Sequence, residues 1–359
     1  MYSRARRSSA RCEGGFRVQY RYSRFSRCQD VCRGAPAVQI VPFDPQQHSH
    51  VDGAAAVWNA ACGPELAISP RLVAYNTRPE RGIEQEGRLA LEGGRVVGVV
   101  LASRLAGQPH VAPEDQGWVD ALAVHPHVQR RGLGAELLGW AVGWLKKRGV
   151  RKASLGGSLR PFCPGLPEEL SAALPFFEEY GWRWNGGDTW DVGRDLGDGR
   201  PIVRHPLPES GPGDGIRAAE AGEEAAVEAF LARAFAGRWH ASAVEFFRQG
   251  GRVEDFIVLR QAGHIEGFAW LTFPNSARPI ERVYPQRLPK PWGHLGPIGV
   301  SEHLRGLGWG GLLLQSGLMA LRARGTRGCV IDWTGLLDFY GKWGFKPYRR
   351  YLFVNASLE

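Results

Sequence analysis

No stretch of the 359-residue sequence approaches the roughly 18 consecutive apolar residues that a membrane-spanning helix needs, so we expect no membrane partner. The six cysteines form no CxxC pair, and outside the N-terminal tail they are Cys62, Cys163 and Cys329, far apart in the chain. No Cys/His spacing fits a zinc site, so we expect no metal. Scattered thiols of this kind are typical of a reducing cytoplasm.

Negative charge is scarce only at the N-terminus. Residues 1–36 contain nine arginines and two acids, a net charge of +7, so the other 323 residues carry only +2 of the total +9. This Arg- and Ser-rich tail has no periodic apolar face and lacks the apolar core of a secretory signal, which predicts disorder. A transit peptide and an over-extended gene start fit it equally. The nearly neutral remainder disfavours a nucleic-acid partner.

Glycine is frequent in two similar stretches. Residues 303–311 read HLRGLGWGG and precede an apolar run, and residues 127–142 read HVQRRGLGAELLGWAV. Aligning the two stretches places Val124 on Val300, a separation of 176 residues. Self-similarity of this kind is the signature of a duplicated unit.

Two further blocks recur in the same order. FFEEYGW at 176–182 matches FYGKWGF at 339–345, and GRVVG at 94–98 matches GHIEG at 263–267. The separation falls from 176 to 163 residues after the glycine-rich stretch, which predicts a longer loop around LRPFCPGLPEEL in the first copy.

The repeats predict two homologous domains. We place the first at residues 37–203 and the second at 215–359, joined by a linker at 204–214 that is rich in Pro, Gly and Ser.

Each copy has the same expected order of elements. A helix is followed by a hairpin, a strand, the glycine-rich loop, an amphipathic helix, another strand, a short helix and the final strands. The hairpins turn at Gly93-Gly94 and Ala262-Gly263, and the strands before the loops cover 119–124 and 294–300. Helical spacing in the first copy is shown by Leu133, Leu137, Leu138, Ala141 and Leu145. This mixture predicts an α/β (α+β) fold with a mixed sheet in each copy.

A strand that enters a glycine loop and then a helix can bind an anion. The first turn of a helix has unpaired N–H groups, and glycines let the backbone approach a phosphate closely. Arg305, or Arg130 and Arg131, would add charge-assisted hydrogen bonds. The spacing fits neither GxGxxG nor GxxxxGK[ST], which excludes the usual dinucleotide and P-loop patterns.

Taken together, these segments resemble the GNAT-type N-acetyltransferase superfamily. LAVHPHVQRRGLGAELL and IGVSEHLRGLGWGGLLL are similar to its acyl-CoA pyrophosphate motif, and FYGKWGFKPY is similar to its C-terminal motif. The resemblance implies a tandem arrangement of two such domains that bind acetyl-CoA as co-substrate. The implied cofactor-binding residues are Leu122, Ala123, Val124, Gln129, Arg130, Arg131, Gly132, Leu133 and Gly134 in the first copy and Ile298, Gly299, Val300, Arg305, Gly306, Leu307, Gly308, Trp309 and Gly310 in the second.

The resemblance also assigns catalytic roles. Tyr340 matches the family tyrosine that protonates the departing thiolate, whereas the first copy has Phe177 there, which donates no proton. The second domain is therefore expected to be catalytic, and the first to bind acyl-CoA weakly or to serve as a scaffold. The general base is open between His294, Asp332 and a water relay, with Asp120 as the corresponding carboxylate of the first copy.

The predicted function is direct transfer of an acetyl group from acetyl-CoA to a primary amine of a small molecule or peptide. Amino sugars, polyamine-like amines, peptide N-termini and protein lysines all fit as acceptors. The alternatives are an acyl-CoA-binding or sensing protein without turnover, and a nucleic-acid-associated factor recruited through the arginine tail. The sequence does not indicate an oligomeric state.

Overall fold

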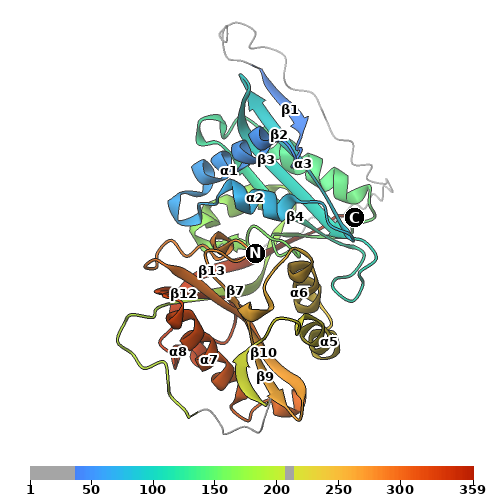
Figure 1. Cartoon of the computed structure of the whole chain (residues 1–359). Coiled ribbons are helices and arrows are strands. Elements are labelled where there is room, and N and C mark those ends of the chain that lie inside the picture. Colours follow the sequence, from blue (N-terminus) through green and yellow to red (C-terminus); the bar gives the residue numbers. More distant parts are fainter. Residues whose placement is uncertain (1–36, 207–213) are drawn as a thin grey trace, which may run out of the picture. The chain divides into compact units, whose positions relative to one another are not determined.

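The computed structural model describes residues 37–206 and 214–359 (Figure 1). The predictions for the tail, and those for most of the linker, lie outside the described residues. The N-terminal half contains β1 (Val38–Pro42), α1 (His48–Cys62), α2 (Pro70–Thr77), β2 (Ile83–Glu92), β3 (Arg95–Leu105), β4 (Gln116–Val124), α3 (Leu133–Lys146), β5 (Lys152–Leu155), β6 (Leu166–Pro167), α4 (Leu174–Glu179) and β7 (Arg183–Asp195).

The C-terminal half repeats this order. It contains β8 (Gly215–Ala218), α5 (Glu224–Ala234), α6 (Arg238–Arg248), β9 (Phe256–Gln261), β10 (His264–Thr272), β11 (Trp292–Val300), α7 (Trp309–Ala323), β12 (Gly328–Thr334), α8 (Leu337–Gly341) and β13 (Lys346–Ser357). Both predicted hairpins are present, and each half opens with two helices where the sequence indicated one. The expected mixed α/β fold is confirmed.

The duplication extends to the contacts between sheet and helix. A Cβ added at Gly117 in β4 would lie 2.6 Å from Leu145 of α3, and one at Gly293 in β11 would lie 2.8 Å from Leu321 of α7. Both pairs are related by the same 176-residue separation. Each glycine lets the helix lie close against the strand, so the repeated spacing of the sequence corresponds to a repeated packing contact.

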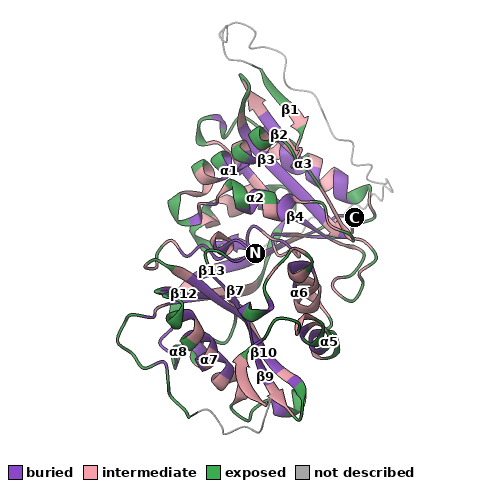
Figure 2. Ribbon diagram, in the orientation of Figure 1, coloured by how far each residue is buried: buried purple, intermediate pink, exposed green. Residues whose placement is uncertain are grey.

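All the strands belong to one mixed sheet. Its order is β1-β2-β3-β4-β5-β13-β7-β12-β11-β10-β9-β8, and β6 pairs with β13. The neighbours β4 and β5 are parallel, as are β11 and β12, whereas the other neighbours are antiparallel. Figure 2 shows buried residues running along β3 and β4, whose apolar sequences suit strands covered on both faces.

The last strand of each copy lies between strands of the other copy. β13 pairs with β5 and β7, both from the N-terminal half, and β7 pairs with β13 and β12, both from the C-terminal half (Figure 1). Two self-contained domains would not show this exchange. The boundaries 37–203 and 215–359 stay a prediction for the chain segments, but the pairing of the final strands crosses them.

The exchanged strands also complete each other's cores. Leu352 and Val354 of β13 are buried in the core beneath α3, and Val192 of β7 is buried in the core beneath α7. Burying a side chain of this size contributes about 1.5–3 kcal/mol. Each half therefore depends on the other for part of its core.

We expect a fragment of residues 214–359 to show no cooperative thermal unfolding when it is produced alone, because β13 loses both neighbours and β12 loses β7. Circular dichroism during heating measures this directly. Adding a fragment of residues 37–206 is expected to restore one cooperative transition. A transition of the isolated C-terminal fragment close to that of the whole chain would contradict the mutual dependence of the halves.

Candidate active site

In each half two parallel strands separate part-way along their length. β4 and β5 pair as far as Val119 and Leu155, and β11 and β12 pair as far as His294 and Val330. The Gly156 amide still donates to the Val119 carbonyl at 2.9 Å, and no main-chain hydrogen bond joins the described strands of either pair beyond that point. Each half therefore has a gap at the centre of its sheet, next to its glycine-rich loop.

The loops end in left-handed glycines that begin the helices. Gly132 has φ 87° and immediately precedes α3, and Gly308 has φ 90° and immediately precedes α7. These values suit glycine and allow the chain to turn sharply into the helix. The first helical amides, Leu133 to Ala135 and Trp309 to Gly310, have no backbone acceptor among the described residues. Both loops thus have the free donors that an anion cradle needs.

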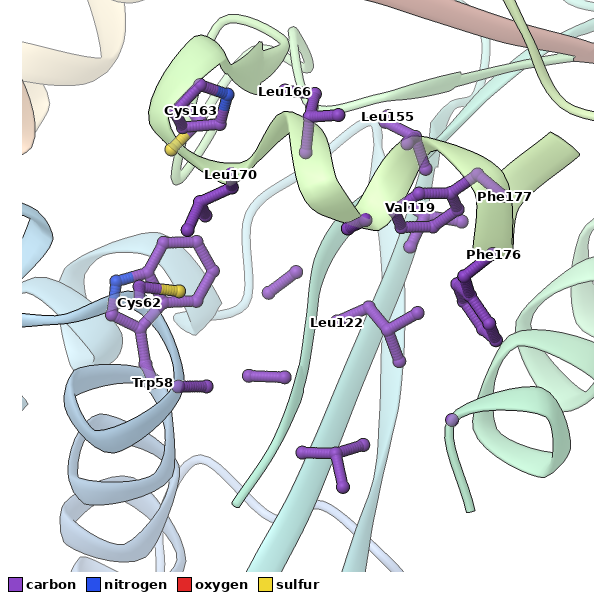
Figure 3. A pocket seen from close by; sticks show the side chains of 18 of the residues that line it. Trp58, Cys62, Val119, Leu122, Leu155, Cys163, Leu166, Leu170, Phe176 and Phe177 are labelled. Carbon is purple, nitrogen blue, oxygen red and sulfur yellow. The ribbon is translucent and has the colours of Figure 1, made fainter. Parts of the chain in front are cut away.

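The N-terminal half contains the larger cleft, of about 610 Å³. It extends from Trp58 and Cys62 of α1 to Phe176 and Phe177 beside the glycine loop (Figure 3). Seven of the expected cofactor residues line it, namely Leu122, Ala123, Val124, Gln129, Arg130, Gly132 and Gly134. Arg131 and Leu133 do not. The aromatic and thiol side chains from α1 carried no recognisable sequence signal.

Asp120, the carboxylate expected in this half, accepts hydrogen bonds from neighbouring side chains. Asp120 is buried, and its oxygens accept hydrogen bonds from Gln85 Nε2 at 2.8 Å and Ser103 Oγ at 3.0 Å. Burial raises the pKa of Asp120. These contacts explain how a carboxyl group is accommodated in an apolar cleft, whose wall Asp120 forms in part.

A second pocket, of about 350 Å³, lies in the C-terminal half. Asp332 and Tyr340 both line it, together with Gly296 to Ile298 of β11. Of the expected cofactor residues in this half, Ile298 alone lines the pocket. The loop Arg305 to Gly308 lies exposed at the surface.

The N-terminal half supplies part of this second pocket. Tyr75 and Asn76 of α2 and Leu159 to Pro161 line it. Ser69 caps the start of α2 by accepting a hydrogen bond from the Leu72 amide, and Pro70 occupies the first helical position. The segment 159–161 belongs to the longer loop predicted for the first copy, so that insertion reaches the other copy's pocket.

Asp332 is held by two partners. Its Oδ1 lies 2.7 Å from His294 Nε2, and its Oδ2 accepts a hydrogen bond from Arg282 at 2.9 Å. Burial alone would raise the pKa of Asp332, but His294 and Arg282 more than offset it and hold this pKa well below its usual range. The carboxylate is therefore ionised at neutral pH and faces the pocket.

His294 lies behind Asp332 rather than in the pocket. Its side chain is fully buried, and its Nδ1 lies 3.3 Å from Thr272 Oγ1, so both ring nitrogens have partners. Burial, reinforced by nearby arginines, lowers the pKa of His294 to about 4. The neutral ring orients Asp332, and the expectation that His294 itself acts as the base finds no geometric support.

Tyr340 lines the same pocket as Asp332. Its side chain is largely buried, with 7% of the residue exposed, and its ring packs edge-on against Phe339 at 5.0 Å. Burial, together with the charge of Asp332, raises the pKa of Tyr340 to about 12. The hydroxyl therefore keeps its proton at neutral pH.

A bulge in β12 directs Asp332 towards the pocket. The pairing of β12 with β7 shifts register between Ile331 and Thr334, and Trp333 has φ 51°. The Trp333 amide donates a hydrogen bond to Asp191 Oδ1 at 3.1 Å. Left-handed backbone at a large residue is strained and often marks a functional site.

Asp191 comes from the exchanged strand β7 and was not among the residues expected from the sequence. It is fully buried and also accepts a hydrogen bond from the Tyr351 hydroxyl at 2.9 Å. Burial and the neighbouring charge of Asp332 raise the pKa of Asp191 to about 7. The pKa values of the two carboxyl groups are thus shifted in opposite directions, because Asp332 lies beside Arg282 and His294, whereas burial dominates at Asp191.

The N-terminal half lacks all three candidate catalytic groups. β4 and β5 pair in the same register as β11 and β12, so His294 and Asp332 correspond to Trp118 and Gly156. Tyr340 corresponds to Phe177, and each accepts equivalent main-chain hydrogen bonds from the residues that follow it. The glycine loop is duplicated, whereas these reactive side chains are not.

Comparison with known proteins agrees with this architecture. A model of the acetyltransferase (GNAT) family matches residues 59–159. The mycothiol acetyltransferase of Actinosynnema mirum is 28% identical over 284 residues, which cover 75% of this chain and 87% of that protein. Residues 59–159 thus match a GNAT acetyltransferase domain, and most of the chain is similar to mycothiol acetyltransferases. The family model matches the half that lacks the tyrosine, so it does not decide which half is catalytic.

Solved structures show the same tandem fold. The glucosamine N-acetyltransferase region of a fungal multi-domain GH3 β-N-acetylglucosaminidase aligns with 91% of this chain at a TM-score of 0.74 and 22% identity, and the chain spans 39% of that protein. A tandem GNAT protein from the clavulanic acid biosynthesis pathway aligns with 90% of this chain and 99% of its own, at a TM-score of 0.65 and 18% identity.

The described residues lack two kinds of feature. None of their helices is long and apolar enough to cross a membrane. Within residues 37–206 and 214–359, no three His, Cys, Asp or Glu side chains are grouped as ligands of a metal ion would be.

Replacing Asp191 by Asn is expected to change how stability depends on pH. Folded Asp191 keeps its proton up to about pH 7, whereas an unfolded aspartate releases its proton near its usual pKa of 3.8. The unfolded chain therefore binds fewer protons in this range, and the stability due to this group falls as the pH rises through it.

Thermal unfolding at about pH 5 and about pH 8 measures this effect. We expect the unfolding temperature of the Asp191→Asn variant to fall less between the two pH values than that of the unaltered chain, by about a few degrees. Equal falls in the two proteins would contradict the raised pKa of Asp191.

Proposed function

We propose that the C-terminal half transfers an acetyl group from acetyl-CoA directly to a primary amine. The observation that carries this proposal is that Asp332 and Tyr340 face one pocket, next to the gap between β11 and β12. Neither group has a counterpart in the N-terminal half. The similarity to mycothiol acetyltransferases supports a small-molecule amine as acceptor.

The residues of the pocket suit the charges of this reaction. The ionised carboxylate of Asp332 attracts the ammonium group of the acceptor and takes part in removing its proton. The amine nitrogen then bonds to the thioester carbonyl carbon as the carbon–sulfur bond breaks. Tyr340 supplies a proton to the departing thiolate, and a positioned acid contributes about 10²–10⁴-fold to a rate. His294 acts as a positioning residue through its hydrogen bond to Asp332.

Acetyl-CoA fits the glycine loops in both halves. A Cβ added at Gly310 would meet no heavy atom within 4 Å, so open space lies against the backbone at the start of α7. The free amides there would hold the pyrophosphate, and Arg305 lies on the same exposed loop. When bound, acetyl-CoA supplies the activated acetyl group.

The N-terminal half is proposed to bind acyl-CoA or to serve as a scaffold. Its apolar cleft leads from the glycine loop into the sheet, but Phe177 offers no proton there. The alternative of an acyl-CoA-binding or sensing protein without turnover would require Tyr340 and Asp332 to be dispensable. The free thiols of Cys62, Cys163 and Cys329 are consistent with the cytoplasm as location.

Changing Tyr340 to Phe is expected to lower kcat by about 10²–10⁴-fold, because it removes the proton donor and keeps the ring. Release of free thiol from acetyl-CoA across a panel of amines measures turnover. The matched control is Phe177→Leu at the corresponding position of the N-terminal half, which should leave turnover nearly unchanged. Loss of turnover in the control, with full activity in Tyr340→Phe, would show that catalysis takes place in the N-terminal half and would contradict the proposal.

Valine substitutions at the two helix starts are expected to distinguish the roles of the two glycine loops. Gly310→Val places a branched side chain where the backbone would approach the pyrophosphate, so the KM for acetyl-CoA should rise about tenfold or more. Gly134→Val does the same in the N-terminal half and should leave turnover intact.

Isothermal titration calorimetry with acetyl-CoA counts the sites. Where the N-terminal cleft binds the ligand, Gly134→Val removes one of two bound molecules per chain. An increase in KM with Gly134→Val alone would argue that the N-terminal loop supplies the reacting acetyl-CoA.

A further inference from the structure

The pocket of the C-terminal half contains more positive than negative charge. Four guanidinium groups and two carboxylates line it, namely Arg160, Arg238, Arg278, Arg282, Glu245 and Asp332. A simple ammonium-binding pocket would be expected to show the opposite balance. The excess of cations therefore needs an explanation beyond the binding of an amine.

The two carboxylates are already paired with arginines. Asp332 is bound by Arg282 at 2.9 Å. Glu245 forms an ion pair with Arg78 and lies 3.7 Å from Arg160. Neither carboxylate is left to neutralise the remaining two arginines.

Arg238 and Arg278 have only uncharged partners. Arg238 donates to the main-chain carbonyls of Gly157, at 2.5 Å, and Ser158. Arg278 donates to Thr272 Oγ1 at 3.0 Å and to the Gly296 carbonyl at 3.4 Å. In the part of the chain that the structure describes, neither guanidinium has a carboxylate within 4 Å.

Arg278 is buried, and Arg238 is half-buried. Burial, with the nearby charge of Arg282, lowers the pKa of Arg278 to about 9 and that of Arg238 to about 10. Arg278 packs over the ring of Trp270 at 3.9 Å, and Arg238 lies over that of Trp333 at 4.8 Å. Both remain charged at neutral pH. A cation withdrawn from water without an opposite charge is costly, and an anionic ligand would offset that cost.

Hydrogen-bond donors are also left over in this cluster. Arg278 Nε and Arg282 Nη1 are buried and have no acceptor among the described residues. A carboxylate or phosphate accepts several hydrogen bonds at once, and the fork of a guanidinium matches such groups.

We infer that the acceptor amine also carries an anionic oxygen-acid group, a carboxylate or a phosphate, which binds to Arg238 and Arg278. This inference rests on the proposed function, since it takes the pocket beside Tyr340 as the acceptor site. The ammonium of the acceptor meets Asp332, and its anion meets the arginines. Polyamines, which carry positive charge alone, are disfavoured by the same cluster.

The N-terminal cleft supports this reading by contrast. Trp58, Cys62, Cys163 and Leu170 occupy the end of that cleft away from the glycine loop (Figure 3). Arg130 is the one arginine that lines it, and it belongs to the glycine loop. The arginine cluster is therefore a property of the half that has Asp332 and Tyr340, not of the fold as such.

The test compares amines that differ only in the anionic group. Glucosamine 6-phosphate is paired with glucosamine, and L-methionine with L-methioninamide. Binding is measured by calorimetry on the full-length Tyr340→Phe protein saturated with acetyl-CoA, so that turnover does not interfere. We expect one member with the anionic group, called the charged member below, to bind at least about tenfold more tightly than its partner without that group, called the uncharged member although it keeps its amine. The pair that shows this preference identifies phosphate or carboxylate.

Substitutions in the cluster locate the anion. Arg238→Gln and Arg278→Lys, added to Tyr340→Phe, should remove most of the preference for the charged member, because each loses a guanidinium fork. Arg95→Gln, at an exposed arginine of the β2–β3 hairpin, is the control and should retain the preference. If a cluster variant unfolds, the comparison of the matched amines on Tyr340→Phe still decides the question.

Equal binding of charged and uncharged members in both pairs would overturn the inference, as would a preference that survives both cluster substitutions. Thiol release by the unaltered chain is measured on the same amines. Preferential binding of the charged member without any amine-dependent thiol release would sustain the inference and refute the proposed function. Amine-dependent thiol release that does not depend on the anionic group would sustain the proposed function and refute the inference.

Discussion

The antiparallel pairing of β7 with β13 is the constraint on which the rest of the structure depends. Each of these strands is the last of its own copy, and each has both neighbours from the other copy. Their apolar side chains complete the opposite cores. The pairing also buries Asp191 and Tyr351 at the centre of the molecule, where they hydrogen-bond to each other. A duplicated unit has thus become a single folding unit, because neither copy buries its full core alone.

This arrangement places residues of one copy in the pocket of the other. Tyr75 and Arg160 of the N-terminal half line the pocket of Asp332 and Tyr340, and Asp191 of β7 holds the bulge at Trp333. The N-terminal cleft, by contrast, is lined by N-terminal residues. The N-terminal copy keeps its glycine loop but has Trp118, Gly156 and Phe177 at the positions of His294, Asp332 and Tyr340. This agrees with the proposed role of that copy as an acyl-CoA-binding unit or a scaffold that supplies walls to its neighbour's pocket.

Local signals in the sequence predicted the elements that local physics determines. The glycine loops, the hairpins and the amphipathic helices depend on backbone conformation and on short-range periodicity, and all of them are present. The strand exchange was not predictable, because the apolar pattern of β7 indicates a strand but does not identify the strand that pairs with it. Asp191, Arg238 and Arg278 were missed for a related reason: each lies far in sequence from Asp332, and only the tertiary fold brings them together. His294 was singled out by its residue type, but its orientation towards Asp332 depends on burial that no sequence pattern reveals.

The arginines of the pocket also help to explain the pKa values of the two carboxyl groups, Asp332 and Asp191. Arg282, with the more distant Arg278, keeps Asp332 ionised even though it is buried, and the charge of Asp332 in turn raises the pKa of Asp191 behind it. A carboxylate with a pKa this low binds an ammonium group through its negative charge, but it is a weak base and does not retain the proton of that ammonium. Proton removal at Asp332 is therefore favoured when the proton can pass onward, whereas Tyr340 remains protonated throughout the neutral range. The same cations that would attract an anionic acceptor thus help to keep Asp332 in the charge state that the proposed acetyl transfer requires.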